Sequence, residues 1–600
     1  MRSSTALGTA LGALGAALGA PSVLALVLAT GCGHGSPEGP SHAAGAPGDR
    51  AAPSVAATSA ASISSGSPAP RHGRRTLTLI GTNDLHGELL GLPLFGGYVE
   101  AMRAARARDG GAVLLVDAGD MFQGTLESNL SEGRAVLRAY AALHYDAATI
   151  GNHEFDYGPV GPAATPESPA DDPRGALKAL AAAASFPMLA ANLADRATGK
   201  RVDWPKVAAS TVVVAAGVRV GLVGVTTEET LDATIRANVA DLAVLPVAET
   251  IVAEAARLRA EQGAQVVVVL AHAGGHCKSP PVPSAPHDCD ENGEIFRVAR
   301  ALPPGAVDAI VAGHSHTAIA REVNGVPIIE SFSRGRAFGR VDLVVEGEPP
   351  RVVERRLFAT RELCPDGGRA CGPVAYDGAT VTADPRITAA IAGDLAVVQA
   401  KRSESLGVHL TTPIRAIYDR ESALGNLVAD LMREAHPSAA IALVNGGGLR
   451  ADLPEGVLTY GALYGVFPFD NRLATAKITG RDLVALLRAH FERTGGILSV
   501  SGARVVAACR GGQLDVRVEI GKKPLRDDAV IEILASDFML TGGDAFWGPV
   551  KPPRTDFSAM LVRDALERGL RKRRALKDAE VLDPKHPRLV LPMARPVKCR

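Results

Sequence analysis

The chain has 600 residues, 46% of them hydrophobic and 21% charged, and 64 Lys and Arg balance 64 Asp and Glu to a formal net charge of +0. This length exceeds what one hydrophobic core usually organises, so we expect two or more domains. The balanced charge excludes a global field that would favour a nucleic-acid polymer or an anionic membrane as partner, so an anionic ligand must be attracted locally.

The first residues have the pattern of an export signal. Arg2 precedes an uncharged run of Ala, Leu and Gly that ends in Leu28-Ala-Thr-Gly-Cys32. The pattern resembles a bacterial lipoprotein signal, which implies removal of residues 1–31 and a lipid anchor on Cys32. A cleaved secretory signal and an uncleaved anchor are the alternatives, and Pro21 disfavours the anchor. We expect an exported protein in the periplasm or cell envelope.

Residues 32–75 consist mostly of Ser, Ala, Pro and Gly. They lack the large apolar side chains that bury a core, so we expect a disordered tether. A tether of this kind would hold a lipid-anchored domain away from the membrane.

Six cysteines remain if Cys32 is lipidated, and an even number in an exported chain is compatible with disulfide bonds. The expected pairs, two from short separation and the third by elimination, are Cys277 with Cys289, Cys364 with Cys371, and Cys509 with Cys599. A zinc knuckle is disfavoured because the chain has no Cys-x-x-Cys pair.

Residues 76–362 alternate apolar runs with Ala-rich stretches of helical periodicity, such as 176–184 and 249–260. The apolar runs are rich in Val, Leu and Ile without polar alternation, which is typical of buried strands in an α/β sheet. These runs are residues 76–80, 112–116, 147–150, 266–270 and 309–311. The sequence therefore predicts a layered α/β domain with sheets flanked by helices.

Each apolar run leads into polar residues that can bind metal ions, at the strand ends where open α/β sheets build their sites. The candidate ligands are Asp84, His86, Asp120, Asn152, His272, His314 and His316. Two carboxylates, one amide and four imidazoles are too many for one tetrahedral ion, and they suit two divalent cations bridged by a carboxylate. Mixed nitrogen and oxygen donors fit Zn, Mn or Fe rather than an all-oxygen Ca or Mg site.

The motifs Asp-x-His, Gly-Asp, Gly-Asn-His-Glu, His and Gly-His-x-His follow one another along the chain. This order resembles that of the calcineurin-like metallophosphoesterases, and residues 151–156 resemble the branch of 5′-nucleotidases and UDP-sugar hydrolases. The resemblance implies a first metal on Asp84, His86 and His316, a bridging Asp120, and a second metal on Asn152, His272 and His314.

The resemblance also implies catalytic roles for His153 and Asp156. His153 would be the cation that meets the phosphoryl group, and Asp156 would orient it. A carboxylate partner fixes the tautomer of an imidazole and favours its charged form. Asp117, three residues before Asp120, is expected to be a structural hydrogen-bonding carboxylate, and His276 a loop residue.

Residues 363–402 are expected to be a linker with a connecting helix, and residues 403–600 a smaller α+β domain. Segments 420–426, 445–450, 467–470 and 538–546 resemble the substrate-binding domain of the same 5′-nucleotidase branch. The resemblance implies that Arg420, Arg450 and Asn445 bind phosphate or ribose-side groups. It also implies that Phe469 and Phe538 stack on the nucleobase and that Asp544 contacts the ribose hydroxyls. Arginine forks and aromatic faces have the chemistry for these contacts.

The expected protein is thus a metal-dependent phosphohydrolase acting on nucleoside 5′-monophosphates, with UDP-sugars and nucleoside di- and triphosphates as further substrates. The alternatives are a 2′,3′-cyclic-nucleotide phosphodiesterase or a sulfur-oxidation hydrolase on the same scaffold, and a nucleotide-binding surface lipoprotein with weak catalysis. The paired phenylalanines and arginines favour a nucleotide over a sulfur ester, and the intact ligand set disfavours lost catalysis. The oligomeric state is left open.

Overall fold

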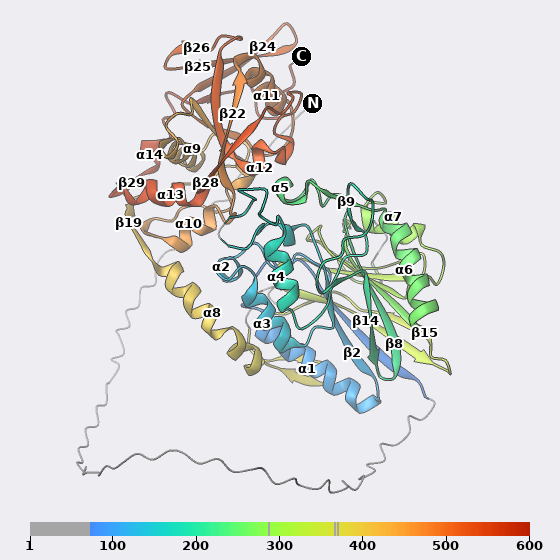
Figure 1. The fold of residues 1–600 in the computed structure, drawn as a ribbon. Helices are drawn as coiled ribbons and strands as arrows, with labels where there is room; N and C mark the ends of the chain where they lie inside the picture. The colour runs from blue at the N-terminus through green and yellow to red at the C-terminus, as the bar shows by residue number, and fades with distance from the viewer. Residues whose placement is uncertain (1–72, 162, 286–287, 365–367, 369–370, 600) are drawn as a thin grey trace, which may run out of the picture. The chain divides into compact units, whose positions relative to one another are not determined.

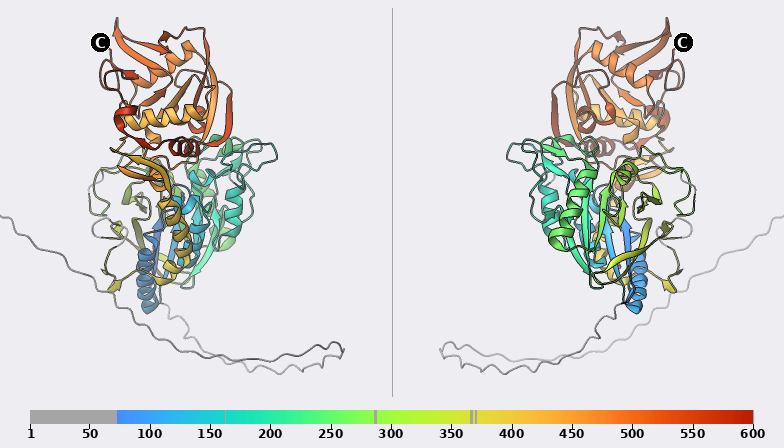
Figure 2. Two further views of the ribbon diagram at one scale, coloured as in Figure 1. Left: turned by 90° about the vertical axis from the view of Figure 1, so that its left-hand side faces the viewer. Right: turned by 90° about the vertical axis from the view of Figure 1, so that its right-hand side faces the viewer.

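The computed structural model describes residues 73–161, 163–285, 288–364, 368 and 371–599. The chain divides into two compact units, residues 1–69 and 70–600, and all described residues belong to the second. The expected signal and nearly all of the expected tether lie outside the described residues. In the second unit, residues coloured blue to yellow gather in one region and those coloured orange to red in another (Figures 1 and 2). No helix in the described part of the chain is long and apolar enough to cross a membrane.

The first region is built on two β-sheets. The larger contains β1 (Arg75–Thr82), β2 (Ala112–Asp117), β3 (Ala147–Thr149), β4 (Met188–Leu189), β6 (Val207–Ala208), β14 (Ala337–Glu346), β15 (Arg351–Leu357) and β16 (Arg361–Glu362). The smaller contains β7 (Ser210–Ala215), β8 (Val218–Thr226), β10 (Val266–His272), β11 (Ala309–Ala312), β12 (Ala318–Val323) and β13 (Val326–Ser331). Their strand orders are β15-β14-β1-β2-β3-β4-β6, with β16 beside β14, and β12-β13-β11-β10-β8-β7.

Alternate side chains of these strands enter different cores. Leu77 of β1 and Val268 of β10 belong to one core, between the two sheets. Ile80 of β1 packs on the opposite side, with α1 (Leu92–Asp109), α3 (Arg134–Leu143) and α4 (Gly175–Ala183). Val267 of β10 packs with α6 (Val247–Gln262) and α7 (Glu294–Ala301), which cover the second sheet (Figure 1). The region is therefore a four-layer α/β/β/α sandwich.

All five apolar runs predicted as strands are strands, but they divide between two sheets. Three are β1, β2 and β3, and two are β10 and β11. The sequence could not divide them, because strands buried on both faces have the same continuous apolar character in either sheet. The two predicted helices are α4 and α6.

Most of the stretch expected to be a linker packs on the first region. It contains the short strands β17 (Val374–Tyr376) and β18 (Ala379–Val381) and the helix α8 (Pro385–Ser403). Asp384 caps this helix by accepting a hydrogen bond from the backbone of Arg386 at 2.8 Å. Leu363, Ile387 and Ile391 are buried in the core beneath α1 and α3, so only the last part of α8 lies beyond that core.

The second region has an α+β architecture. Its central sheet contains β20 (Ile441–Asn445), β22 (Arg472–Thr479), β23 (Leu498–Ser501), β27 (Val530–Ser536) and β28 (Thr555–Leu561), in the order β23-β20-β27-β22-β28. Side chains from one face pack with α9 (Ala423–Ala435) and α13 (Val562–Arg571), and those from the other with α11 (Gly480–Glu492). Smaller elements are α10 (Tyr460–Val466), α12 (Asp537–Leu540), α14 (Asp578–Val581), β19 (Ser405–Leu410), β21 (Gly456–Thr459), β24 (Arg504–Arg510), β25 (Gln513–Ile520), β26 (Lys523–Pro524), β29 (Ala575–Leu576) and β30 (Leu589–Val590).

The three expected disulfide bonds are present. They join Cys277 to Cys289, Cys364 to Cys371, and Cys509 to Cys599. The first closes the Pro-rich insertion between the histidine motifs, and the third ties β24 to the C-terminal segment.

Candidate metal and nucleotide site

The strands of the first region deliver the candidate ligands to one place. Asp84, Asp120 and Asn152 follow β1, β2 and β3 in chain order, His272 is the last residue of β10, and His314 lies just beyond β11. Because the pairs β1 with β2, β2 with β3, and β10 with β11 are parallel, these residues share the carboxyl edges of two stacked sheets. All seven predicted ligands are brought together there.

One group of donors consists of Asp84, His86 and His316, whose ligand atoms lie within 4.8 Å of one another. His316 Nε2 is 3.4 Å from Asp84 Oδ1. The Nε2 atoms of His86 and His316 are 2.9 Å apart. Asp120 Oδ2 lies 3.9 Å from His86 Nε2, so its carboxylate connects this group to the next.

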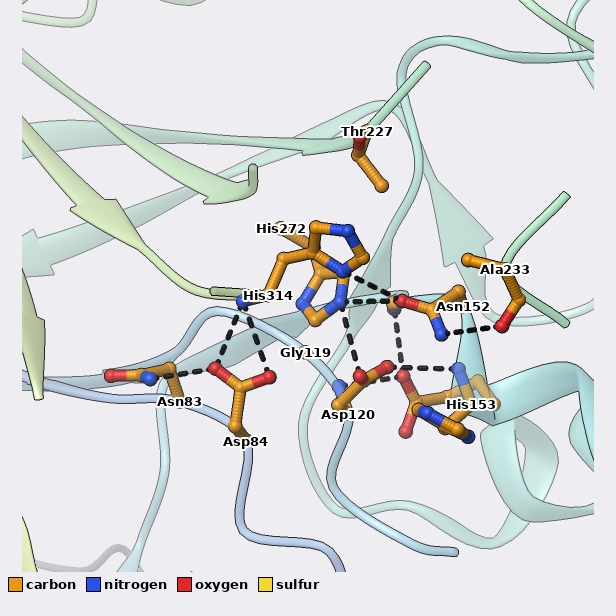
Figure 3. A network of polar contacts seen from close by, with 12 residues as sticks. Asn83, Asp84, Gly119, Asp120, Asn152, His153, Thr227, Ala233, His272 and His314 are labelled. Atoms are coloured by element: carbon orange, nitrogen blue, oxygen red, sulfur yellow. Dashed lines mark hydrogen bonds and ion pairs between the residues drawn. The ribbon is translucent and has the colours of Figure 1, made fainter. Parts of the chain in front are cut away.

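The second group consists of Asp120, Asn152, His272 and His314 (Figure 3). His272 Nε2 is 3.2 Å from Asp120 Oδ2 and 3.0 Å from Asn152 Oδ1. His314 Nδ1 is also 3.0 Å from Asn152 Oδ1. These donors, drawn from four separate motifs, therefore point at a common centre, and Asp120 lies between this group and the first.

The hydrogen bonds of two histidines show that their inward nitrogens are suited to a cation. His86 donates from Nδ1 to the carbonyl of Gln123 at 2.8 Å, and His272 donates from Nδ1 to the carbonyl of Ala118 at 2.8 Å. In the neutral imidazole this leaves Nε2 as an acceptor. Acceptor nitrogens that face carboxylate and amide oxygens need positive charge between them, so the donor set fits divalent metal ions.

The charges of the cluster agree with this interpretation. Burial acts to lower the pKa of His272, but the carboxylates of Asp120, Asp84 and Glu154 together outweigh burial and raise that pKa to about 10. Burial lowers the pKa of His86 to about 4, and the nearby charge of His153 adds to the effect. The cluster therefore attracts positive charge, which is a proton on His272 when no metal is bound. A bound cation would replace that proton and leave His272 in the neutral form that coordinates metal.

The backbone around the ligands is held in an unusual conformation. Five of the seven candidate ligands have a positive φ, between 49° and 79°, namely Asp84, His86, Asp120, His314 and His316. Such residues cost about 1–3 kcal/mol each and persist only where surrounding contacts fix them. A Cβ atom at Gly151 would collide with Asp120 Oδ1, so the approach of two motifs requires glycine there.

Glu154 is a supporting residue that the sequence did not reveal as such. Its buried carboxylate accepts hydrogen bonds from the backbone of Asp120 at 2.8 Å, Met121 at 2.7 Å and Gly151 at 2.7 Å. Burial, and then the charge of Asp120, raise the pKa of Glu154 to about 8. Glu154 joins the second motif to the third, and its place in Gly-Asn-His-Glu was the only signal in the sequence.

Asp117 has the structural role that was expected. Its buried carboxylate accepts hydrogen bonds from Thr82 at 2.6 Å, from Tyr140 at 2.8 Å and from the backbone of Gly119 at 2.8 Å. These bonds hold the turn between β2 and Asp120. Asp117 is in none of the groups of candidate ligands found in the described residues.

His153 and Asp156 form a close pair beside the ligands. His153 Nδ1 lies 2.5 Å from Asp156 Oδ2, and the backbone N–H of His153 donates to Asp120 Oδ1 at 2.8 Å. Burial acts to lower the pKa of His153, but the charges of Asp156 and Asp120 outweigh it and raise that pKa to about 10. The imidazole is thus a cation at neutral pH, with Nδ1 committed to Asp156.

A cavity of about 560 Å³ contains residues from both regions. On the first-region side it is lined by Gln123, His153, Asp156, Ala233, Thr234 and Ile235. On the other side it is lined by five of the six predicted substrate-binding residues, Asn445, Arg450, Phe469, Phe538 and Asp544. Arg420 is exposed and does not line the cavity.

The second-region wall has supports that the sequence did not predict. Asp544 has a φ of 53°, and its carboxylate accepts a hydrogen bond from Asn445 Nδ2 at 2.6 Å. Arg493 donates to the carbonyls of Asp544 at 2.8 Å and Ala545 at 2.9 Å, which holds this turn. His490 accepts from Arg493 at Nδ1 and donates from Nε2 to the carbonyl of Gly496 at 2.8 Å. No motif marked His490 or Arg493, because their role depends on contacts with a distant turn.

The sequence matches two known families. Residues 77–318 match the calcineurin-like phosphoesterases, and residues 398–549 match the 5′-nucleotidase C-terminal domain. Over 510 residues the chain is 25% identical to a 5′-nucleotidase of Vibrio cholerae, covering 78% of this chain and 85% of the relative. Over 498 residues it is 27% identical to the endonuclease YhcR of Bacillus subtilis, covering 79% of this chain but only 38% of that longer relative.

A solved structure is similar along most of the chain. The crystal structure of a 5′-nucleotidase precursor from Thermus thermophilus superposes with a TM-score of 0.59 at 25% identity, and the match covers 86% of this chain and 99% of the other. The chain belongs to the 5′-nucleotidase family of metallophosphoesterases, in which a calcineurin-like domain precedes a 5′-nucleotidase C-terminal domain.

Proposed function

We propose that this protein is an exported, metal-dependent phosphohydrolase that releases phosphate from nucleoside 5′-monophosphates. The observation that carries the proposal is the cavity, because His153 and Asp156 face the same space as Phe469, Phe538 and Asp544. A phosphoryl group and a nucleobase can therefore be held by opposite walls. Similarity to the Vibrio cholerae 5′-nucleotidase supports the same substrate class. UDP-sugars and nucleoside di- and triphosphates are proposed as further substrates.

We assign two divalent cations, Zn, Mn or similar, to the ligand cluster. Asp84, His86 and His316 would hold one, Asn152, His272 and His314 the other, and Asp120 would bridge them. The inward-facing acceptor atoms of both groups support this assignment. When bound, such cations neutralise charge on phosphoryl oxygens and acidify water for attack in line with the leaving group.

The protein's own residues would bind and orient the substrate. Asp156 holds the Nδ1 proton of His153, which leaves the Nε2–H to donate to a phosphoryl oxygen and stabilise the charge that develops there. Phe469 and Phe538 would stack on the base, and Asp544 would accept hydrogen bonds from ribose hydroxyls. Arg450, which lines the cavity, would bind phosphate or ribose-side oxygens.

Export is part of the proposal. The three disulfide bonds support an oxidising compartment, because such bonds are rare in the cytosol of most organisms. A lipid anchor on Cys32 remains an expectation from the sequence, since this residue lies outside the described part of the chain.

The test is a substrate panel with full-length protein stripped of metal and reloaded with Mn or Zn. AMP, UDP-glucose and 2′,3′-cyclic AMP would be compared by chromatography of their products, which are adenosine and phosphate from AMP, UMP and glucose 1-phosphate from UDP-glucose, and an adenosine monophosphate from the cyclic nucleotide. His153→Ala is the control that retains the base-binding wall. We expect AMP to have the highest kcat/KM and His153→Ala to lose at least about 10²-fold in kcat. Preference for the cyclic nucleotide would support the phosphodiesterase, and nucleotide binding without turnover would support the binding lipoprotein.

A further inference from the structure

A short segment of the first region runs beside the residues that carry His153. This segment follows β8 and includes the short helix α5 (Arg236–Val239). Its contacts with the catalytic segment are Ala233 O with Asn152 Nδ2 at 3.1 Å, Thr234 Oγ1 with Asp156 Oδ1 at 2.8 Å, and Asn238 Nδ2 with Phe155 O at 2.8 Å (Figure 3 shows the first). The contacts lie on both sides of His153 in the chain.

The contact of Thr234 has a specific geometry. Thr234 is only 7% exposed, and it also lines the cavity. Its hydroxyl donates to one carboxylate oxygen of Asp156, while the other oxygen is 2.5 Å from His153 Nδ1. A carboxylate with a fixed donor on each oxygen cannot rotate freely about the bond that joins it to the rest of its side chain. Thr234 therefore fixes which oxygen of Asp156 faces the imidazole of His153.

The loop is held in place by other contacts. Glu294 accepts hydrogen bonds from Thr227 Oγ1 at 2.5 Å and from the backbone N–H of Glu228 at 3.1 Å. Asn238 anchors the other end through Phe155. The loop therefore does not depend on the Thr234 hydroxyl for its position, which leaves that hydroxyl to orient Asp156.

We infer that Thr234 is a positioning residue that acts through Asp156 on His153. It keeps one Asp156 oxygen on His153 Nδ1, so the imidazole stays rotated with its Nε2–H toward the cavity and the phosphoryl group. The inference deepens the proposed function and rests on it. No contact between Thr234 and the substrate is needed.

The test compares Thr234→Val with Thr234→Ser and with Thr230→Val, a matched control. Thr230 lies in the same loop, is buried, and bonds only Thr226 among the described side-chain contacts. With metal-loaded full-length protein and AMP, we expect Thr234→Val to lower kcat about 10- to 100-fold with little change in KM or metal content. Thr234→Ser should stay within about threefold of the wild type, and Thr230→Val should be unchanged.

A double-mutant cycle tests the route of the effect. If Thr234 acts through Asp156, then Thr234→Val added to Asp156→Asn should cost little more than Asp156→Asn alone. The inference would be overturned if the losses in kcat from Thr234→Val and Asp156→Asn were additive, or if Thr234→Val lost metal. It would also be overturned if Thr230→Val lowered kcat as much as Thr234→Val. If valine disturbs folding, Thr234→Ala against Thr230→Ala repeats the comparison. An inactive wild type overturns the proposed function and the inference with it, whereas an active wild type with unaltered Thr234→Val overturns the inference alone.

Discussion

The ligand cluster and the second-region wall of the cavity are organised differently. Five of the seven candidate ligands are at most 5% exposed, whereas none of the six predicted substrate-binding residues is buried. The cluster is fixed by left-handed backbone, by Glu154 and by the hydrogen bonds that the outward nitrogens of His86 and His272 donate to backbone carbonyls. The wall is fixed mainly by one turn clamped by Arg493. Coordination requires donors at set positions, but a wall that admits a base must remain open.

The same difference is seen in the histidines of the two regions. The carboxylates around His272 raise its pKa to about 10 even though burial opposes this. Burial and the charges of Arg595 and Arg493 lower the pKa of His490 to about 3. His272 of the first region is thus kept positively charged by nearby carboxylates, whereas His490 of the second region is kept neutral and serves as a hydrogen-bonding support.

The largest effect is expected from the cluster. His272→Ala should lower kcat on the order of 10³-fold and remove metal, because the charge stabilisation by the cations is worth several kcal/mol. His276→Ala, an exposed histidine four positions along the chain, is the control and should match the wild type. Phosphate release and metal analysis provide the measurement. Full activity of His272→Ala would show that the cluster is not the reaction centre.

Loss of an aromatic side chain from the second-region wall of the cavity should weaken substrate binding and leave turnover nearly unchanged. Phe538→Leu should raise the KM for AMP about 10- to 100-fold at nearly constant kcat, since stacking on a base is worth about 1–3 kcal/mol. Phe557→Leu, an exposed phenylalanine of β28, is the control. Initial-rate kinetics measure both parameters. A fall in kcat with unchanged KM would mean that Phe538 serves the chemistry and not the base.

His490 should make the folded protein sensitive to acid. Its pKa is about 3 in the folded state and about 6.5 when unfolded, so below pH 6.5 the unfolded chain gains a proton that the folded chain does not. Stability should therefore fall as pH falls toward 3, by about 1.4 kcal/mol per unit. Between pH 6.5 and 4.5, His490→Gln should lose about 2–3 kcal/mol less than the wild type in urea unfolding. His409→Gln, at an exposed histidine of β19, is the control and should show the acid sensitivity of the wild type. Equal acid sensitivity of His490→Gln would contradict this account.

Substitutions of the two arginines implied by the resemblance, Arg450 and Arg420, should have different effects on the KM for AMP. Arg450 lines the cavity and Arg420 does not, so Arg450→Ala should raise the KM for AMP about 10-fold and Arg420→Ala less than about twofold. Initial-rate kinetics on both variants check this. An equal effect of Arg420→Ala would show that the second region moves during turnover and brings this side chain to the substrate.

The sequence predicted the cluster better than the wall for a physical reason. Each ligand ends a buried strand or lies within four residues of its end, so a short motif records both its chemistry and its position. In the wall, five of six predicted residues meet at the cavity, but exposure of Arg420 depends on the path of an irregular loop. Thr234 and Arg493 carry no motif at all. Thr234 meets Asp156 across 78 positions of chain, a proximity that only the folded structure reveals.

The central claim is that seven side chains of the first region bind two cations at one centre. Anomalous diffraction from crystals grown with Mn²⁺ tests it most directly. The account predicts two peaks about 3.5–4 Å apart, with Asp120 between them and His272 and His86 on different ions. A single peak, or peaks that leave Asp120 and His272 without a cation, would contradict it.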